Sequence, residues 1–280
     1  MRWIRTFIIL FFILAAAVFG VSRVQEFRER DETIPVITSD REILEIPCDY
    51  TQDQLLKGLT AYDEKDGDLT DEIVAGNFSR FLSPGLCNVT YVVFDSSDQP
   101  GTLTRQVRFS DYHSPEFTLT EPLVFEEGRG SYSAVMERLG AQDLLDGDLS
   151  EWIVQTDTDA SYQRAGDYHI QAEVENSYGD ISSLSLPVHV VKSGSQDVRI
   201  GLTSWILYLE QGGAVSPADY IGEVSGADGS RIDAGQVTWE SSVDTQTPGV
   251  YEIHYTVSDG RGQTGETWMT VVVRGQEVAQ

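Results

Sequence analysis

The sequence contains few of the residues on which common catalytic and metal centres depend. Its 280 residues include two cysteines and four histidines. No spacing of these residues matches a zinc site, and the sequence has no P-loop, no dinucleotide-binding fingerprint and no G-x-S-x-G motif. The sequence therefore indicates neither nucleotide-dependent nor zinc-dependent chemistry. We expect a protein that is not an enzyme and that has no cofactor, with calcium as the one metal still to be weighed.

Basic residues are also scarce. The chain has 19 lysines and arginines against 45 aspartates and glutamates, which gives a formal net charge of -26. Such a chain repels a phosphate backbone at long range, so we expect no nucleic-acid partner. The acidic balance favours solubility in a salty, cation-rich medium outside the cell.

A long apolar run occurs at the N-terminus, from Phe7 to Val21, after Arg2 and Arg5. Fifteen helical residues span roughly 23 Å, which is less than a hydrocarbon core of ~30 Å, so the flanking residues would have to contribute. We interpret residues 1–22 as an uncleaved signal anchor, with a cleaved signal peptide as the alternative. The charged residues 23–33 would form a stalk next to the membrane.

The remainder of the chain is repetitive. The segment AYDEKDGDLTDEI at residues 61–73 recurs as AQDLLDGDLSEWI at residues 141–153. Pro35 and Pro115 begin extended runs with the same offset, and a more divergent copy is clearest at residues 247–273. The expected organisation is module one at 34–110, module two at 114–191, module three at 197–274 and a tail at 275–280.

Each module contains short strands in which apolar and polar residues alternate, separated by turn residues. This pattern is typical of half-buried antiparallel strands and predicts an all-β fold of tandem sandwiches. Residues 51–59 and 131–140 could each hold one helical turn. The short linkers predict modules joined nearly end to end. The expected inward-facing residues are Cys87, Val89, Tyr91 and Val93, then Tyr168, Ile170, Ala172 and Val174, then Tyr251, Ile253, Tyr255 and Val257.

Three segments in order, PVIT, GLTAYDEKDGDLTDEI and SPGLCNVTYVVFDSSD, resemble the bacterial surface Ig-like repeat family, which includes the Ig-like modules of pesticidal crystal proteins. Modules one and two carry the A-x-D-x-x-D-G-D-[IL]-[ST] segment. Modules one and three carry the Pro-Gly pair, at Pro84 and Pro248, that precedes the last alternating strands. The resemblance covers roughly residues 33 to 274. It implies three immunoglobulin-like sandwiches on an exported bacterial protein, and it implies no activity, since fold does not determine function.

The acidic segments allow two interpretations. Calcium needs six to eight oxygen ligands, and the candidate ligands are Asp63, Asp66, Asp68, Asp143, Asp146 and Asp148. The EF-hand template fails, because Lys65 falls at its third position. Alternatively, each Asp-Gly pair forms a turn, with Asp68 or Thr70 accepting hydrogen bonds from backbone amides. Module three retains Asp228-Gly229-Ser230, which keeps the turn chemistry and loses a carboxylate. We therefore prefer the structural interpretation.

Both cysteines lie in module one. The resemblance places Cys87 where Tyr168 and Tyr251 stand in the other modules, at the position of the corner tyrosine of immunoglobulin-like sandwiches. A Cys48–Cys87 disulfide could replace that tether, with roughly 4 kcal/mol of stabilisation from closing a loop of about 39 residues. A disulfide would agree with export. The alternative is two buried thiols that act as small apolar groups.

Taken with the resemblance, these patterns favour a single-pass cell-membrane protein whose C-terminal modules lie outside the cell. The modules would act as a spacer, adhesion or binding array for a glycan, a wall polymer or a protein, for example by strand addition at a sheet edge. The sequence names no contact residue, since exposed and core tryptophans are not distinguishable here. The alternatives are a calcium-stiffened adhesive rod and a carboxylate-dependent glycan hydrolase, which would need a carboxylate pair that no residue marks.

Overall fold

The computed structural model describes residues 2–29, 33–259 and 262–275. Four expected features lie partly outside these residues: position 1 of the anchor, 30–32 of the stalk, 260–261 of module three and 276–280 of the tail. The chain forms two compact units. Unit 1 comprises residues 1–46, 50–79 and 86–108, and unit 2 comprises residues 47–49, 80–85 and 109–280.

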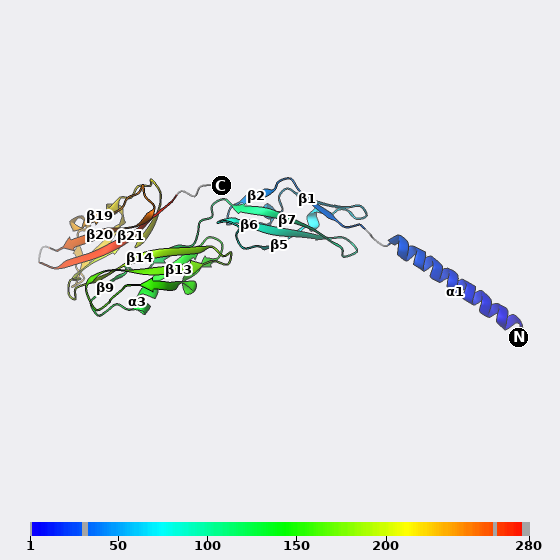
Figure 1. Ribbon diagram of the computed structural model, residues 1–280, viewed down its shortest axis with the longest axis horizontal. Helices are drawn as coiled ribbons and strands as arrows, with labels where there is room; N and C mark the ends of the chain where they lie inside the picture. Colours follow the sequence, from blue (N-terminus) through cyan, green and yellow to red (C-terminus); the bar gives the residue numbers. More distant parts are fainter. Residues whose placement is uncertain (1, 30–32, 260–261, 276–280) are drawn as a thin grey trace. The chain divides into compact units, whose positions relative to one another are not determined.

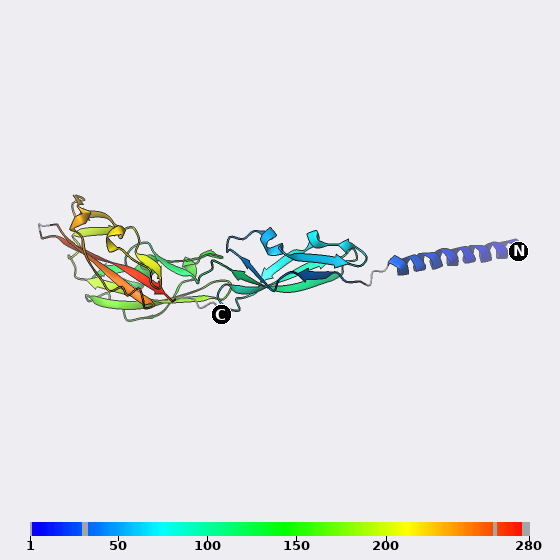
Figure 2. The same ribbon diagram turned by 90° about the horizontal axis from the view of Figure 1, so that it is seen from above.

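Helix α1 runs from Arg2 to Glu29 and is continuous (Figure 2). Its apolar stretch, Trp3–Arg23, has 21 residues and a mean hydropathy of 2.5, with none of it buried. At 1.5 Å per residue this stretch spans about 32 Å, which is enough to cross a membrane and longer than the run from Phe7 to Val21 suggests. A signal sequence near an N-terminus passes the same test.

Module one, in unit 1, is a sandwich of two sheets that cover a common core. One sheet has the order β1-β3-β4 and the other β2-β7-β6-β5. The strands are β1 Val36–Ser39, β2 Ile43–Ile46, β3 Leu59–Asp63, β4 Gly67–Asp68, β5 Val74–Phe78, β6 Leu86–Phe94 and β7 Pro100–Phe109. The expected helical turn occurs as α2 at Gln52–Leu56, and a 3-10 turn, η1, at Thr70–Glu72 leads into β5.

Module two repeats this plan in unit 2. Its sheets have the orders β11-β10-β8 and β12-β13-β14-β9, and β9 runs parallel to β14. The elements are β8 Glu116–Leu119, β9 Val124–Glu126, α3 Tyr132–Met136, β10 Leu139–Asp143, β11 Gly147–Asp148, η2 Ser150–Trp152, β12 Val154–Thr158, β13 Gly166–Glu175 and β14 Ile181–Val191. The helical turn α3 again matches the expectation.

Module three, also in unit 2, has sheets β15-β17-β18 and β16-β21-β20-β19, with β16 parallel to β21. The elements are β15 Val198–Leu202, β16 Ile206–Glu210, η3 Pro217–Tyr220, β17 Ile221–Gly226, β18 Arg231–Ile232, η4 Ala234–Gln236, β19 Thr238–Ser241, β20 Gly249–Ser258 and β21 Thr264–Arg274. The six sheets therefore form three sandwich-like units, as the strand pattern predicts at this level.

The alternating strands bury the side that the sequence indicates. Cys87, Val89, Tyr91 and Val93 have no exposed surface. Tyr168 and Tyr251 are half-buried, and each hydroxyl donates to a backbone carbonyl four residues upstream, at 3.0 and 2.9 Å respectively. These contacts confirm the corner tyrosines, because the phenol fixes the start of the strand to the preceding loop.

Modules two and three pack side by side within unit 2, where strand β14 lies next to β20 and β8 lies next to β16 (Figure 1). Ile206 and Val272 of module three belong to the core cluster of module two. The Phe117 amide donates to the Tyr208 hydroxyl at 2.7 Å. These two modules are therefore not separate beads joined end to end. The expectation was wrong because a period-2 pattern shows which face is apolar but not which module covers it.

The expected disulfide is absent, and both cysteines are free thiols. The Cys87 thiol is buried in β6 and donates to the Val107 carbonyl at 3.8 Å. The backbone amide of Cys48 donates to Asp111 at 2.7 Å. Burial raises the pKa of Cys87 to about 12, and burial together with a hydrogen bond to Asp111 raises the pKa of Cys48 to about 12. Both thiols thus remain protonated at neutral pH. The alternative interpretation of a buried thiol holds for Cys87, whereas Cys48 is half-buried.

Candidate functional site

The acidic segment of module two forms the turn between β10 and β11. Asp143 Oδ1 accepts hydrogen bonds from the backbone amides of Leu145 and Asp146, at 2.8 and 2.9 Å. Asp148 Oδ1 accepts from the Ser150 amide at 3.0 Å and from its hydroxyl at 2.5 Å. The Ser150 hydroxyl bond, followed by its amide bond, lowers the pKa of Asp148. These two carboxylates therefore hold the turn and the start of η2.

The third carboxylate of this turn, Asp146, reaches the neighbouring hairpin. It accepts from the Ser177 amide at 2.6 Å and from the Ser177 hydroxyl at 2.8 Å. Because Ser177 lies in the turn between β13 and β14, this contact joins the two sheets at one end of the sandwich.

Module one repeats these contacts except the hydroxyl bond of Ser177 to Asp146. Asp63 Oδ1 accepts from the Lys65 and Asp66 amides at 2.8 and 3.0 Å. Asp66 Oδ2 accepts from the Ser96 amide at 2.8 Å. Asp68 Oδ1 accepts from the hydroxyl of the residue that begins η1 at 2.6 Å and from its amide at 3.0 Å, bonds that lower the Asp68 pKa.

This geometry favours the structural interpretation of the acidic segments. Gly67 and Gly147 have φ angles of 82° and 76°, which only glycine adopts easily, so both Asp-Gly pairs are true turns. In module three, Asp228 accepts from the Ser230 amide at 2.9 Å and Gly229 has a φ of 76°. Within the described parts of the chain, no group of three or more His, Cys, Asp or Glu side chains is arranged to hold a metal.

A further residue completes this structure in modules one and two, and the sequence analysis gave it no role. In module two this residue is Asn176, which directly follows β13 and has a buried side chain. Its Oδ1 accepts from the Tyr178 and Asp180 amides, both at 3.0 Å. Its Nδ2 donates to Asp143 Oδ2 at 3.1 Å and to the Tyr112 hydroxyl at 2.9 Å. We call Asp143, Asp146 and Asn176 the module-two corner.

In module one the same position holds Asp95, at the end of β6. Its Oδ1 accepts from the Ser97 and Gln99 amides, both at 2.8 Å. Asp63, Asp66 and Asp95 form the module-one corner. The family motif includes an aspartate at the end of this strand, but only the fold shows which groups Asp95 contacts.

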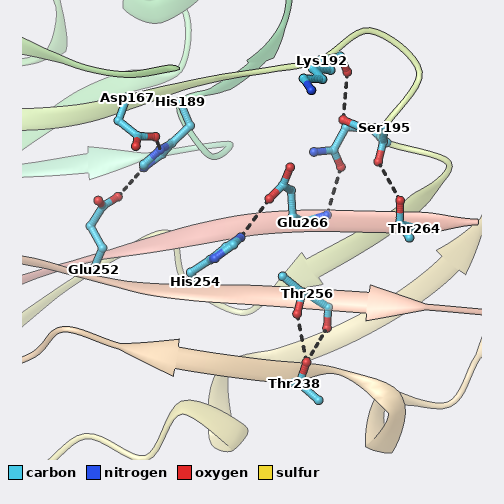
Figure 3. A network of polar contacts seen from close by, with 11 residues as sticks. Asp167, His189, Lys192, Ser195, Thr238, Glu252, His254, Thr256, Thr264 and Glu266 are labelled. Atoms are coloured by element: carbon cyan, nitrogen blue, oxygen red, sulfur yellow. Dashed lines mark hydrogen bonds and ion pairs between the residues drawn. The ribbon is translucent and has the colours of Figure 1, made fainter. Parts of the chain in front are cut away.

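A histidine network connects modules two and three within unit 2 (Figure 3). His189 on β14 is buried, with its Nδ1 2.8 Å from Asp167 Oδ1 of β13 and its Nε2 2.6 Å from Glu252 Oε1 of β20. Its ring stacks on Trp268, with centroids 4.0 Å apart and planes at 10°. His254 stacks on Trp268 at 4.1 Å and reaches Glu266 at 3.0 Å.

Opposing effects act on His189. Burial by itself lowers its pKa, but the hydrogen bond and charge of Glu252, followed by those of Asp167, raise the pKa overall. A protonated ring donates from both nitrogens, so the imidazolium joins a module-two strand to a module-three strand. Strand alternation does not reveal this contact, because the partner carboxylate comes from another module.

The exposed surface of module two contains a groove of about 720 Å³. Trp152, Val154 and Ile181 supply its apolar floor and are 68%, 57% and 57% exposed. Val154 begins β12, an edge strand of its sheet. Carboxylates surround the floor, namely Asp146, Asp148, Glu173 and Glu175. An aromatic ring within a concave acidic rim is a candidate contact surface.

Two kinds of comparison relate the chain to known sequences. Residues 210–273 match the family model described as "Bacterial surface protein, Ig-like domain". Pesticidal crystal protein Cry22Aa of Bacillus thuringiensis is 31% identical over 144 residues, which is 49% of this chain and 19% of that protein. An uncharacterized 81.3 kDa protein of Acholeplasma phage L2 is 32% identical over 147 residues, or 48% of this chain and 18% of that protein. The chain thus aligns with about a fifth of each relative.

The comparison with solved structures also found multi-domain proteins. Drosophila N-cadherin EC1-4 has a TM-score of 0.24 at 10% identity, covering 88% of this chain and 68% of that one. The Clostridium perfringens ZmpB structure with the M60 catalytic domain and two CBM51 domains has a TM-score of 0.24 at 12% identity, covering 88% and 31%. TM-scores below 0.5 support no statement about function.

The family match covers the part of module three that contains the Pro-Gly pair at Pro248. The sequence matches confirm the resemblance inferred from the sequence, which includes the likeness to pesticidal crystal proteins. The chain therefore carries a bacterial surface Ig-like domain and is distantly related to Cry22Aa.

Proposed function

We propose that this protein is a membrane-held bacterial surface protein whose three immunoglobulin-like modules act as a binding array, and that the groove of module two binds a glycan. The observation that carries the proposal is the exposed Trp152 ring on the floor of an open groove. A ring of this size is normally buried or covered by a partner, so its 68% exposure is informative.

The chemistry of the groove favours a neutral or amino-bearing sugar. The apolar face of a pyranose ring can pack on the indole, and its hydroxyls can donate to carboxylates on the rim. Glu173 and Asp148 are on that rim. A polymer with a phosphate backbone would be repelled by these groups and by the net charge of -26.

The location and the absence of catalysis also belong to this proposal. Helix α1 is long and apolar enough to anchor the chain, which would leave modules one to three outside the membrane. A binding role is favoured over hydrolysis, because Asp66, Asp68, Asp146 and Asp148 accept hydrogen bonds from turn amides or hydroxyls. At Asp68 and Asp148 these bonds lower the pKa of the carboxyl group, whereas a glycosidase acid must carry a proton.

The proposal can be tested with the full chain in detergent micelles and a neutral N-acetylglucosamine tetrasaccharide as the probe, with binding followed by tryptophan fluorescence and calorimetry. Trp152→Ala should weaken binding at least tenfold, equivalent to about 1.4 kcal/mol. Trp239→Ala is the matched control, since that ring is 42% exposed and lies outside the groove. Equal binding by both variants, or preferential binding of an anionic glycerol-phosphate polymer, would contradict a sugar site in the groove.

A further inference from the structure

Two buried carboxylates in module one lack the partner that their counterparts have in module two. Asp63 and Asp95 are 1% and 6% exposed. The Oδ1 atom of Asp63 accepts hydrogen bonds from two turn amides and from the Thr33 hydroxyl. The Oδ1 atom of Asp95 accepts hydrogen bonds from two turn amides. In each, Oδ2 is buried and has no hydrogen-bond partner among the described residues.

Module two shows where these two oxygens lie relative to each other. Asn176 and Asp95 each accept, through Oδ1, hydrogen bonds from two turn amides at equivalent positions. The backbone amide of Asn176 donates to the Asp180 carbonyl at 3.0 Å, and that of Asp95 donates to the Gln99 carbonyl at 3.2 Å. Asn176 directs its Nδ2 at Asp143 Oδ2, the counterpart of Asp63 Oδ2. In module one, Asp95 therefore places an acceptor where module two has a donor, and two acceptors face each other.

A cation resolves this conflict. Both carboxylates already accept backbone amides through Oδ1, so only Oδ2 of each is left to bind an ion. Neither carboxylate forms an ion pair with a described lysine or arginine, although aspartate is almost never fully buried without a partner. A hydrogen-bond donor, which Asn176 supplies in module two, is missing here.

We propose that the module-one corner binds Ca²⁺ between Asp63 Oδ2 and Asp95 Oδ2. The ligands are hard oxygens, and calcium sheds water and accepts irregular geometry more readily than Mg²⁺. With two carboxylates, the affinity belongs in the range of extracellular modules, about 10⁻⁴ to 10⁻³ M. This site differs from the acidic segment considered from the sequence, since Asp66 and Asp68 are not its ligands, and it does not depend on the glycan proposal.

The ion would also hold the start of module one in place. Thr33 donates its hydroxyl to Asp63 at 3.2 Å and accepts a hydrogen bond at its carbonyl from the Gln99 side chain at 2.9 Å. Thr33 is the last residue of the expected stalk and directly precedes module one, so a bound cation would order the entry of the chain into the sandwich.

The test measures amide hydrogen exchange of the full chain in micelles, with calcium or magnesium at about 10 mM, ten times the weak end of that range. We expect calcium to slow exchange roughly tenfold in segments 62–70 and 95–100, and magnesium to act much less. Segments 142–150 and 176–181, from the module-two corner, are the internal control and should not change.

Two reciprocal variants decide the assignment. Asp95→Asn should abolish the calcium effect while keeping the fold, because the new amide can donate to Asp63 as Asn176 does to Asp143. Asn176→Asp should create calcium-dependent protection in module two. Exchange in the parent chain that does not respond to calcium, or protection that persists in Asp95→Asn, would overturn the proposal, whether or not Asn176→Asp folds.

Discussion

Modules one and two have the same strand order and the same acidic turn, but they differ in what stands opposite that turn. In module two, Asn176 donates to the buried Asp143, and every buried side-chain atom of that pair has a partner. In module one, Asp95 takes the same place and leaves two buried oxygens without donors. The two corners differ by one atom, the side-chain nitrogen of Asn176 in place of an oxygen of Asp95. That atom decides whether the hydrogen-bond network is complete or needs a cation.

The last strands of the two modules differ in a similar way. His189 of β14 pairs in register with Asp167, and Arg108 of β7 pairs with Leu86 at the corresponding position. Only the histidine can change its charge near neutral pH, and only module two is joined through this position to module three. A shared fold thus carries one module suited to ion binding and one suited to a titratable contact between modules.

The largest expected effect comes from removing the central carboxylate in each corner. In calcium-free buffer, Asp143→Ala should cost unit 2 about 3 kcal/mol, since two turn amides and the Asn176 side chain lose their acceptor. Asp63→Ala should lower the stability of unit 1 by only about 1 kcal/mol, because the variant also removes the unpaired acceptor that faces Asp95.

Urea unfolding can follow both units in one chain. Four of the five tryptophans lie in unit 2 and report its transition, while labelling of the buried Cys87 thiol reports the opening of unit 1. Equal losses in the two variants would show that the two corners are energetically alike and would remove the basis of the comparison.

A smaller effect is expected at His189 and depends on pH. Since its folded-state pKa is raised above the ordinary value of 6.5, the stabilisation is fully present below that value and is lost as pH rises through the raised pKa. His189→Gln should therefore cost unit 2 about 2 kcal/mol at pH 6 and much less at pH 9.

The control for this prediction is His169→Gln, because His169 lies on the exposed side of neighbouring strand β13. Tryptophan-detected unfolding at several pH values is the measurement. A cost for His189→Gln that stays constant from pH 6 to pH 9 would mean that the ring acts by packing on Trp268 and not by charge.

The smallest effect is expected at Tyr112, which the module-two corner uses as an additional bridge. Its hydroxyl donates to Asp180 at 2.7 Å and accepts from Asn176, and burial followed by the Asp180 bond raises its pKa, so the phenol stays protonated. Tyr112→Phe should lower the stability of unit 2 by about 1 kcal/mol. Tyr62→Phe, at a tyrosine that is 61% exposed in module one, should change stability by less than about 0.5 kcal/mol in the same unfolding assay.

Local pattern was sufficient for a large part of the fold. The Gly-turn and period-2 signals predicted the long hairpins β6-β7, β13-β14 and β20-β21, and the helical turns α2 and α3 occur where they were expected. The Asp-Gly pairs predicted turns at Gly67 and Gly147, and both have positive φ. These features depend on residues close in sequence, which is why they could be read without coordinates.

The disulfide and the arrangement of modules two and three were predicted wrongly for the opposite reason. Cys48 and Cys87 had a plausible spacing, but spacing does not show which side chains meet. Ile206 and Val272 were recognisable as apolar, yet they cover the core of a neighbouring module. The histidine network, the Trp152 groove and the role of Asp95 were missed because their neighbours come from distant segments.

The sequence by itself determined the repeat, the alternation of each strand, the turns and the apolar helix, since each is set by sterics and hydrophobicity within a few residues. Only the tertiary structure decided that Asp95 opposes Asp63, that His189 meets a glutamate from another module and that Trp152 lies open to solvent. The energy of a buried charge depends on the atoms that surround it, and folding brings those atoms from segments that are far apart in the chain.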